Sequence, residues 1–456
     1  MPTVALTAGD VAAATGGRLV AGQPSAPIGR IGIDSRVVRP GDFFVAIRGE
    51  RFDGHDFVGR AFEAGAAGAL VERADAAPAD GRLLIEVADT TRALQAMARE
   101  VRRRSGARVV AITGSAGKTT TKEVCAGLLA ERYRVFRNKG NLNNHIGLPL
   151  SLLELRDGPD VAVVELGMNH PGEIRTLVGI AEPEVRVWTN VGDAHIGFFA
   201  SADAIADAKA EILEQAAPGA VLVANADDPR ITSRIGRFAG RTVTFGIERP
   251  ADVRASAVRL LGLDGVQADV ETPAGAFRLQ SPLLGLGNLA NVLAATAVAV
   301  TFDVPVEAIA SRVTRLEPAH HRGELLRLPG GLTLIDDSYN SSPAALKRSL
   351  ETVAAASGSA RKVAVLGEML ELGSHAPALH RECGAAAREA GLDLLVAVGS
   401  GAAADLAAAA VAAGMPAASV AHVADREAAI AETLRRVRPG DLVLVKGSRG
   451  IGLDAV

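Results

Sequence analysis

The sequence has little cysteine and no long uninterrupted hydrophobic run. Its two cysteines, Cys125 and Cys383, lie far apart and form no CxxC pair. We therefore expect neither a disulfide framework nor a zinc knuckle, and a reducing, cytoplasmic location fits. The most apolar windows, Leu289–Phe302 and Ala404–Pro416, contain polar residues and are shorter than the ~18–20 residues of a membrane span. The first residues lack the basic and apolar regions of a signal peptide, so we expect no membrane insertion.

An excess of one charge is also absent, and lysine is scarce. The 456 residues carry 49 basic and 52 acidic side chains, a net charge of −3. We therefore expect no nucleic-acid partner and no anionic membrane surface. Only seven of the basic residues are lysines, and the others are arginines. Because arginine stays protonated in proteins, amine chemistry requires a lysine, and each lysine inside a motif is a candidate for it.

Strand-like apolar runs alternate with helix-like segments along the chain, which predicts an α/β protein. Its length predicts about three domains, and changes in the pattern place them at residues 1–87, 88–317 and 318–456. We expect a small α/β N-terminal domain, a central P-loop-type mononucleotide-binding α/β domain and a Rossmann-like C-terminal α/β domain. The segment Val253–Leu279 is expected to form an antiparallel sheet edge, and Glu317–Gly323 to be a linker.

A glycine-rich loop follows the predicted strand Val109–Thr113 and opens a predicted helix at Lys118. A phosphate-binding loop needs this context, because its backbone amides and the helix N-terminus attract anions. Lys118 is expected to bind the β- and γ-phosphates of ATP, and the Thr119 hydroxyl to bind Mg²⁺. The alternative is a glycine-rich turn with an exposed lysine. The candidate ATP-binding residues of the loop are Thr113, Gly114, Ser115, Ala116, Gly117, Lys118, Thr119 and Thr120.

Three further residues are candidates for a metal site beside this loop. Glu165 ends an apolar run, and ligands bind at the carboxyl ends of buried strands in α/β proteins; the alternative is a strand-end acid that caps the next helix. His195 follows another predicted strand and is either a metal ligand or a hydrogen-bonding loop residue. Lys209 lies on an alanine-rich helix. A desolvated lysine has a lowered pKa and, once neutral, is able to add carbon dioxide, whereas the alternative is a solvated helix lysine.

These residues and their order resemble the Mur ligase family of ATP-dependent amide ligases. The loop reads TGSAGKTT, the variant found in ligases of cell-wall precursors and of folate. Similar motifs cover essentially the whole chain, and their ordered combination is specific. They are Asp34–Arg36 in the N-terminal part, Lys139–Pro149, Glu165–Ile174 and Gly287–Asn291 in the central part, and Asp336–Asn340, Gly367–Gly373 and Lys446–Arg449 in the C-terminal part.

The resemblance implies a role for each matching residue. It implies two Mg²⁺ ions bound by Thr119, Glu165, His195 and Lys209, the lysine as a carbamate formed with carbon dioxide. The catalytic residues would be Lys118, Lys209, Glu165 and His195. Additional ATP contacts are implied for Asn288, Asn291, Arg322 and Asp336. Substrate contacts are implied for Asp34, Ser35 and Arg36 with a uridine diphosphate sugar, for Asn141, Asn143 and Asn144, and for Asn340 and Ser341 with the incoming amine.

Three positions depart from the family pattern. Gly287 stands where the family commonly has histidine, His321 where it commonly has glycine, and Ala210 where it often has glycine. We expect these departures to change details of the adenine and ribose contacts but not the reaction.

The resemblance implies amide synthesis from ATP through an acyl phosphate. Within the family, the C-terminal motifs favour a ligase that joins D-alanyl-D-alanine to the terminal carboxylate of UDP-N-acetylmuramoyl-tripeptide. This reaction is a cytoplasmic step of peptidoglycan synthesis. We expect the enzyme to be a monomer. One alternative is a ligase that adds a single amino acid, of another Mur type or of the folylpolyglutamate type. A different alternative is a P-loop switch protein without ligase chemistry.

Overall fold

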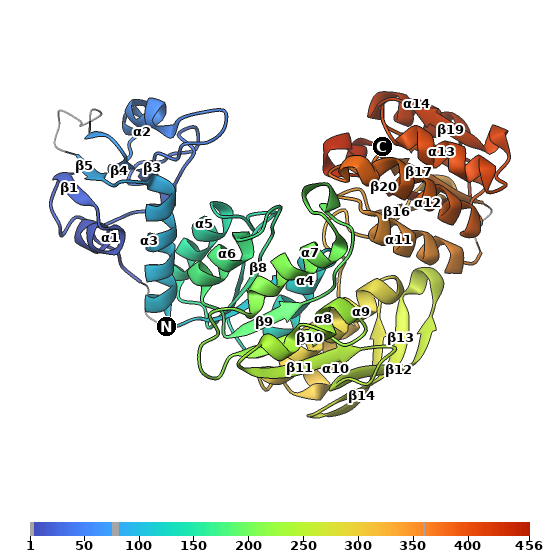
Figure 1. Cartoon of the computed structure of the whole chain (residues 1–456), viewed down its shortest axis with the longest axis horizontal. Helices are drawn as coiled ribbons and strands as arrows, with labels where there is room; N and C mark the ends of the chain where they lie inside the picture. Colours follow the sequence, from blue (N-terminus) through green and yellow to red (C-terminus); the bar gives the residue numbers. More distant parts are fainter. Residues whose placement is uncertain (1–3, 75–81, 359–360) are drawn as a thin grey trace.

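The computed structural model describes residues 4–74, 82–358 and 361–456. Its strands form three sheets that follow one another along the chain, with helices packed around them (Figure 1). The predicted α/β class is confirmed. Each sheet lies within one of the three predicted residue ranges, and the boundaries between these ranges stay predictions. In Figure 1 the first and third sheets lie at the upper left and upper right of the central one.

The N-terminal sheet has the strand order β1-β5-β4-β3-β2. Its strands are β1 (Arg18–Ala21), β2 (Ile31–Gly32), β3 (Phe43–Val45), β4 (Gly68–Val71) and β5 (Leu83–Glu86), and its helices are α1 (Ala8–Thr15) and α2 (Val58–Glu63). The long helix α3 (Thr90–Ser105) begins after Asp89, whose side chain accepts a hydrogen bond from the Arg92 amide. Helix α3 packs against both α1 and the central helix α5, so it joins the first two domains.

The central sheet has the order β14-β13-β12-β11-β10-β9-β6-β8-β7. Its strands are β6 (Arg108–Thr113), β7 (Val135–Arg137), β8 (Val161–Glu165), β9 (Val185–Trp188), β10 (Val221–Asn225), β11 (Arg241–Gly246), β12 (Val253–Leu260), β13 (Val266–Thr272) and β14 (Gly275–Ser281). Its helices are α4 (Lys118–Leu129), α5 (Gly147–Leu153), α6 (Glu173–Ala181), α7 (Ala202–Ala210), α8 (Pro229–Thr232), α9 (Gly285–Thr301) and α10 (Val306–Val313).

The inner strands of this sheet are parallel, whereas β12, β13 and β14 form the antiparallel edge that the sequence pattern predicts. Every residue of β8 is buried. A parallel strand is covered by helices on both faces, which explains why its sequence is continuously apolar rather than alternating.

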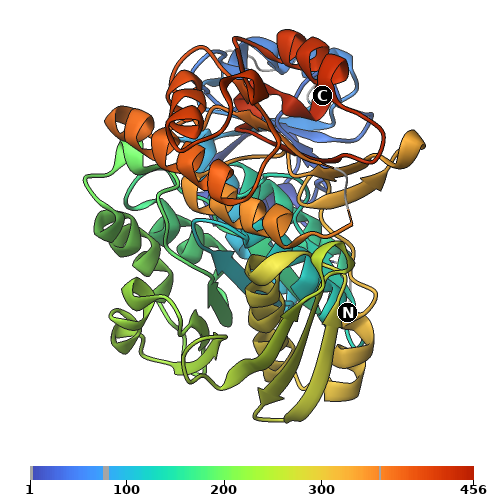
Figure 2. The same cartoon turned by 90° about the vertical axis from the view of Figure 1, so that its right-hand side faces the viewer.

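The C-terminal sheet has the order β15-β16-β20-β17-β18-β19 and is parallel except for β15. Its strands are β15 (Glu324–Arg327), β16 (Thr333–Asp336), β17 (Lys362–Gly367), β18 (Leu394–Val398), β19 (Val420–Val423) and β20 (Leu442–Lys446). Its helices are α11 (Pro343–Ala355), α12 (Ala376–Glu389), α13 (Ala403–Ala412) and α14 (Arg426–Arg436). Figure 2, a view from the side, shows this domain above the central one.

The carboxyl ends of β6, β8 and β9 lie at one edge of the central sheet, because the three strands are parallel neighbours. Ligands of open α/β sheets bind at such an edge. Within the described part of the chain, no helix combines the length and apolar character that crossing a membrane requires.

Candidate active site

A cavity of about 770 Å³ opens at this edge of the central sheet, between the central and C-terminal domains. Most of the predicted site residues line it, together with Glu50 from the N-terminal domain. The predicted residues on its wall are Ser115, Ala116, Gly117, Lys118, Thr119, Thr120, Asn141, Asn143, Asn144, Glu165, His195, Asn288, Asn291, Arg322, Asn340 and Ser341. The remaining predicted residues lie outside the cavity wall: Thr113, Gly114, Lys209, Asp336, Asp34, Ser35 and Arg36.

The glycine-rich loop connects β6 to α4 as predicted, and two of its glycines have no room for a side chain. Gly114 has φ 156° and Gly117 has φ 78°. A Cβ atom on Gly114 would lie 1.9 Å from the Thr189 hydroxyl, and one on Gly117 would lie 2.3 Å from Asn291 Oδ1. Close packing against the neighbouring strand and α9 therefore requires glycine at both positions.

Lys118 is the first residue of α4, and its Nζ donates a hydrogen bond to the Gly114 carbonyl at 2.9 Å. Burial lowers the pKa of Lys118, Glu165 opposes that shift, and Arg322 adds to it. The amine therefore lies in a cavity wall that also carries a negative carboxylate, Glu165, and a second cation, Arg322. This environment suits an anion that brings more than one negative charge.

Glu165 ends β8 and is almost fully buried, with 4% of its surface exposed. Its Oε2 accepts a hydrogen bond from the Thr119 hydroxyl at 2.7 Å, and its Oε1 accepts one from the Asn143 amide at 2.9 Å. Its backbone amide donates to Asn138 Oδ1 at 3.1 Å. The carboxylate and the hydroxyl predicted to bind Mg²⁺ are thus direct neighbours, and oxygen donors of this kind suit Mg²⁺.

Lys209 is not among the residues that line the cavity; it lies near the end of α7, with 2% of its surface exposed. It forms no hydrogen bond or ion pair with any residue that the structure describes. Burial lowers the pKa of Lys209 well below its ordinary value, the charge of Lys118 lowers it further, and Glu165 opposes both. The alternative interpretation of Lys209 as a solvated helix lysine is therefore wrong. The side chain is a buried amine, and burial favours its neutral form.

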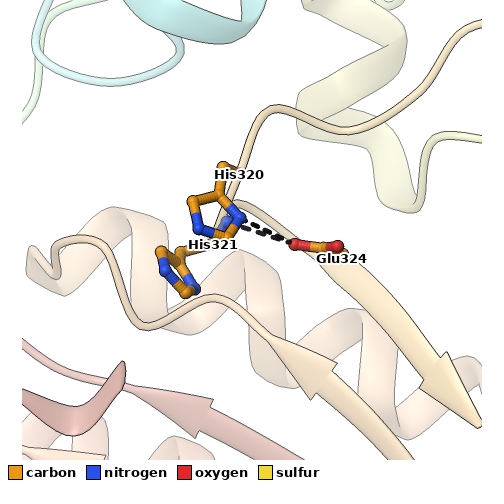
Figure 3. Close-up of side chains that lie close together, drawn as sticks. All are labelled: His320, His321 and Glu324. Atoms are coloured by element: carbon orange, nitrogen blue, oxygen red, sulfur yellow. Dashed lines mark hydrogen bonds and ion pairs between the residues drawn. The ribbon is translucent and has the colours of Figure 1, made fainter. Parts of the chain in front are cut away.

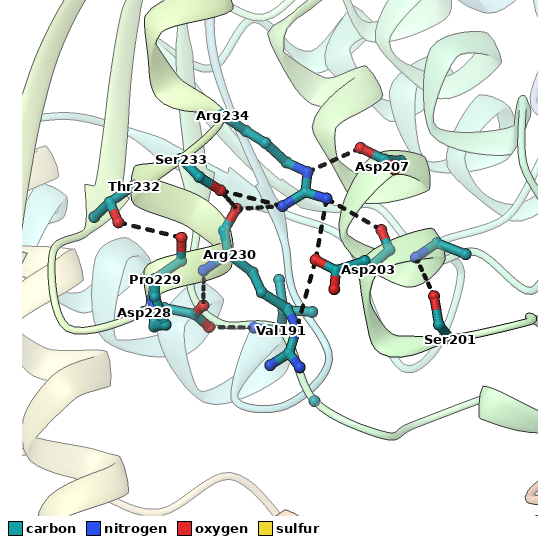
Figure 4. Close-up of polar contacts among 12 residues, drawn as sticks. Val191, Ser201, Asp203, Asp207, Asp228, Pro229, Arg230, Thr232, Ser233 and Arg234 are labelled. Carbon is teal, nitrogen blue, oxygen red and sulfur yellow. Dashed lines mark hydrogen bonds and ion pairs between the residues drawn. The ribbon is translucent and has the colours of Figure 1, made fainter.

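A polar network on the other side of α7 fixes the helix that carries Lys209 (Figure 4). Arg234 donates to Asp207 at 2.9 Å and to Asp203 at 3.3 Å, both on α7. Asp228 caps α8 and accepts a hydrogen bond from the Val191 amide at 2.7 Å. The network therefore couples α7 to α8 and to the loop after β9, which also carries His195. The sequence predicts helix over Ala202–Ala216, whereas α7 ends at Ala210 and continues as the short 3₁₀ turn Glu211–Leu213.

His195 points toward the C-terminal domain, where its Nδ1 lies 2.6 Å from Glu371 Oε2. The Gly197 amide donates to the Glu371 carbonyl at 2.9 Å, so this contact ties two domains together. Burial and the charge of Lys118 lower the pKa of His195, and Glu371 opposes the shift. Glu371 is a cavity residue without a predicted role, although it lies inside the motif Gly367–Gly373.

The N-terminus of α9 forms another part of the wall through Asn288 and Asn291. Asn291 Oδ1 accepts a hydrogen bond from the Thr121 hydroxyl at 3.2 Å, and its Nδ2 donates to Asn288 Oδ1 at 3.3 Å. Gly287 lies beside them and is closely packed, since a Cβ there would lie only 3.2 Å from Cδ of Arg348 on α11. The guanidinium of Arg348 lines the cavity and forms no hydrogen bond or ion pair with a described residue. Sequence reasoning missed this arginine, and the only available signal was the absent side chain at position 287.

Arg322 and Asp336 behave differently from each other. The Arg322 guanidinium lines the cavity and lies 4.0 Å from the ring centre of Tyr339. The Asp336 carboxylate instead lies 2.6 Å from His321 Nδ1 and accepts hydrogen bonds from the Ser338 amide at 3.1 Å and hydroxyl at 2.6 Å. In this conformation Asp336 therefore contacts protein groups rather than the cavity.

The C-terminal wall carries Asn340 and Ser341. The Ser341 hydroxyl is buried and has no hydrogen-bond partner among the described residues, which marks it as a group available to a ligand. Lys446 ends β20 and supports this wall, since its Nζ donates to Asp337 Oδ2 at 2.6 Å and to the Asn340 carbonyl at 3.1 Å.

The predicted uridine-sugar residues lie apart from this cavity, in the N-terminal domain. Arg36 donates to both carboxylate oxygens of Asp34, at 2.9 and 2.7 Å, and this contact lowers the pKa of Asp34 to about 2. Ser35 is buried beside them, whereas the Arg36 side chain is 75% exposed. An exposed arginine held in one orientation is available to an anionic group.

Comparisons with known proteins cover the whole chain. Three family models match this chain. They are the Mur ligase family catalytic domain over residues 27–102, the Mur ligase middle domain over 112–299 and the Mur ligase glutamate ligase domain over 321–449.

Individual relatives match over almost the whole chain. UDP-N-acetylmuramoyl-tripeptide–D-alanyl-D-alanine ligase of Bacillus subtilis (strain 168) is 34% identical to this chain, in an alignment that covers 93% of this chain and 92% of the relative. The structure of MurF from Acinetobacter baumannii has a TM-score of 0.90 and 32% identity, covering 100% of this chain and 98% of that one. The structure of MurF ligase from Thermotoga maritima in complex with ADP has a TM-score of 0.82 and 31% identity, covering 93% and 95%. The chain therefore belongs to the Mur ligase family.

Proposed function

We propose that the protein is the ATP-dependent ligase that joins D-alanyl-D-alanine to the terminal carboxylate of UDP-N-acetylmuramoyl-tripeptide. The observation that carries this proposal is the cavity in which the phosphate loop, Glu165 and His195 face the C-terminal residues Asn340 and Ser341. Relatives with this activity match more than nine-tenths of the chain. All of the residues concerned belong to one chain, so we propose a monomer that works in the cytoplasm, where ATP is available.

The first chemical step activates a carboxylate, which is a poor electrophile. An oxygen of the tripeptide carboxylate attacks the γ-phosphorus of ATP, the bond to the β-phosphate oxygen breaks, and an acyl phosphate and ADP result. Both reactants are anionic and repel each other. Lys118 offsets this repulsion from its position at the start of α4, where the loop amides and the helix N-terminus add partial positive charge.

The residues around Glu165 fit two Mg²⁺ ions and a carbamylated lysine. We propose that Thr119 and Glu165 hold one ion and that His195 and Lys209, as its carbamate, hold the other. Mg²⁺ would neutralise charge on the phosphates and on the attacking carboxylate. The buried Lys209, unpaired among the described residues, supports the carbamate. A neutral amine that the positive charge of Lys118 reaches would gain a favourable negative charge when it adds carbon dioxide.

The second step forms the amide. The neutral amine of D-alanyl-D-alanine attacks the acyl carbon, phosphate leaves, and the nitrogen loses one proton. We propose that Asn340 and the unpaired Ser341 hydroxyl bind the dipeptide on the C-terminal wall. Closure of this wall over the acyl phosphate would align the amine and exclude water.

ATP and the nucleotide sugar would bind in different domains. We propose that Asn288, Asn291 and Arg348 bind the adenosine side of ATP, that Arg322 contacts its phosphates, and that Asp336 contacts the ribose while it keeps its hydrogen bond to His321. Asp34, Ser35 and Arg36 would bind the uridine diphosphate, whose charge complements the exposed Arg36 guanidinium. Asn141, Asn143 and Asn144 would then hold the peptide between the two sites.

A phosphate-release assay tests the proposal. The protein is supplied with Mg²⁺-ATP and UDP-N-acetylmuramoyl-tripeptide, containing either lysine or diaminopimelate as third residue, and then with D-alanyl-D-alanine or glutamate. We expect phosphate release that requires both the tripeptide and the dipeptide. Phosphate release with glutamate but not with D-alanyl-D-alanine would indicate a ligase that adds a single amino acid. Slow ATP hydrolysis that neither amine changes would indicate a P-loop switch protein.

A further inference from the structure

A second group of metal-ligating side chains lies outside the proposed active site, where the linker enters the C-terminal domain. It contains His320 and His321 of the linker and Glu324, the first residue of β15 (Figure 3). One donor atom from each side chain lies within 4.8 Å of the others. His320 Nδ1 is 3.3 Å from Glu324 Oε2, and the centres of the two imidazole rings are 3.6 Å apart.

The orientation of His321 is already fixed by a carboxylate. Its Nδ1 lies 2.6 Å from Asp336 Oδ2, so Nδ1 carries the proton and donates it in this hydrogen bond. In the neutral imidazole, the other ring nitrogen, Nε2, then carries the lone pair that can bind a metal. Metal-ligating histidines in proteins usually have this arrangement, in which a carboxylate fixes the tautomer and makes the free nitrogen more basic.

We propose that His320, His321 and Glu324 form a site for a divalent transition metal of the Zn²⁺ class. Two imidazoles and one carboxylate are the donor set of open zinc sites, in which water supplies the fourth ligand. The ligands proposed for Mg²⁺ beside the phosphate loop are instead mostly oxygen atoms, with His195 as their one imidazole. The His320 side chain is 78% exposed, so it is free to turn toward the metal and complete the site.

The position of this site gives metal binding a consequence. Arg322 follows directly and reaches into the active-site cavity, and Glu324 begins the sheet of the C-terminal domain. A metal bound by all three side chains would tie the linker to that sheet. It would restrict the motion between the central and C-terminal domains that the reaction cycle requires, and this consequence rests on the function proposed above.

Binding is tested on the full chain with Co²⁺, whose visible absorption reports its ligands. We expect saturable Co²⁺ binding in the presence of excess Mg²⁺, with displacement by Zn²⁺. His320→Ala and Glu324→Gln should each weaken it by about tenfold or more. His422→Ala, which removes an exposed histidine of β19, is the control and should bind as the parent does. The proposed metal site would be refuted if both variants, His320→Ala and Glu324→Gln, bound Co²⁺ as the parent does, or if the control lost binding equally. Circular dichroism tests whether each variant is folded.

The consequence for activity is tested separately in the phosphate-release assay at saturating Mg²⁺. Zn²⁺ at concentrations that fill the site should slow turnover of the parent and of the His422→Ala control several-fold, and should slow the His320→Ala variant less. Equal inhibition of all three proteins would refute the restriction of domain motion. The Co²⁺ measurement needs no activity, so failure of the proposed function leaves the test of the metal site intact.

Discussion

Replacement of Lys209 is the sharpest test of the chemistry proposed here. The amine is buried, has no partner among the described residues, and lies close enough to Lys118 and Glu165 to feel both charges. A lysine with only a structural role would be poorly placed, since its charge is neither solvated nor paired. The proposed carbamylation would remove this difficulty, because it would convert the amine into a carboxylate that suits Mg²⁺.

The effect of burial on carbamate formation follows from the fraction of neutral amine. An ordinary lysine, with a pKa of about 10.4, is neutral in roughly one molecule in a thousand at pH 7.4, and each unit by which burial lowers the pKa raises this fraction about tenfold. Because the pKa of Lys209 lies well below the ordinary value, a much larger fraction is available to carbon dioxide near neutral pH. As the pH falls toward the lowered pKa, the amine becomes protonated, so we expect both the carbamate and the activity to decline on the acidic side.

The assay combines carbon-13 NMR with kinetics. With ¹³C-labelled bicarbonate, the parent should show a carbamate resonance that Lys209→Ala lacks. Lys347→Met, the control, should keep it, because the contact with Glu382 raises the pKa of Lys347 and keeps that amine protonated. We expect Lys209→Ala to lose at least about 100-fold in kcat, or ~2.7 kcal/mol. Short carboxylic acids should partly restore the rate, and valerate most, since its atoms replace those of the lost side chain and carbamate. A parent without the resonance, or an alanine variant with full activity, would refute the reasoning.

Three further predictions concern other parts of the site. Glu165→Gln should lower kcat by about 100- to 1,000-fold while the thermal unfolding midpoint changes little, since the amide keeps the size but not the charge of the carboxylate; an unchanged kcat contradicts it. Arg348→Ala should raise the KM for ATP about tenfold, consistent with the loss of a cation–π contact with the adenine. The control replaces Arg388, an exposed arginine of α12, with alanine and should leave this KM unchanged. Equal effects of the two substitutions would contradict the proposal that Arg348 binds ATP. Arg234→Met should lower the free energy of unfolding by about 1 kcal/mol in urea titrations, because partly exposed carboxylates on α7 lose their partner, and a double-mutant cycle with Asp207→Asn should show coupling between the two residues.

Much of the fold is predictable because its core strands are parallel and buried on both faces. Such strands are continuous apolar runs, and β8 and β20 stand out in the sequence for this reason. Strands at sheet edges give a weaker signal. β7, β15 and β19 are short and half-exposed, and neither their hydrophobicity nor their periodicity separates them from loops.

The candidate site is predictable where chemistry and backbone conformation act together on a short segment. The phosphate loop needs glycine at Gly114 and Gly117 and a cation at Lys118, so its sequence alone identifies it. Contacts between domains leave no such pattern. Glu371 reaches His195 from another domain, and Arg348 covers Gly287 from α11, and both pairings depend on how the domains pack.

His321 illustrates how a contact distant in sequence overrides a local rule. Its backbone is left-handed, with φ 57°, a conformation that costs most residues roughly 1–2 kcal/mol and favours the glycine common in the family. The hydrogen bond from Nδ1 to the Asp336 carboxylate contributes ~1.5–3 kcal/mol, as bonds to charged groups do, and this is enough to offset the strain. Histidine is therefore tolerated because Asp336 lies opposite it on β16. The same bond leaves Nε2 free, so the residue that breaks the family pattern also provides the ligand on which the proposed metal site depends.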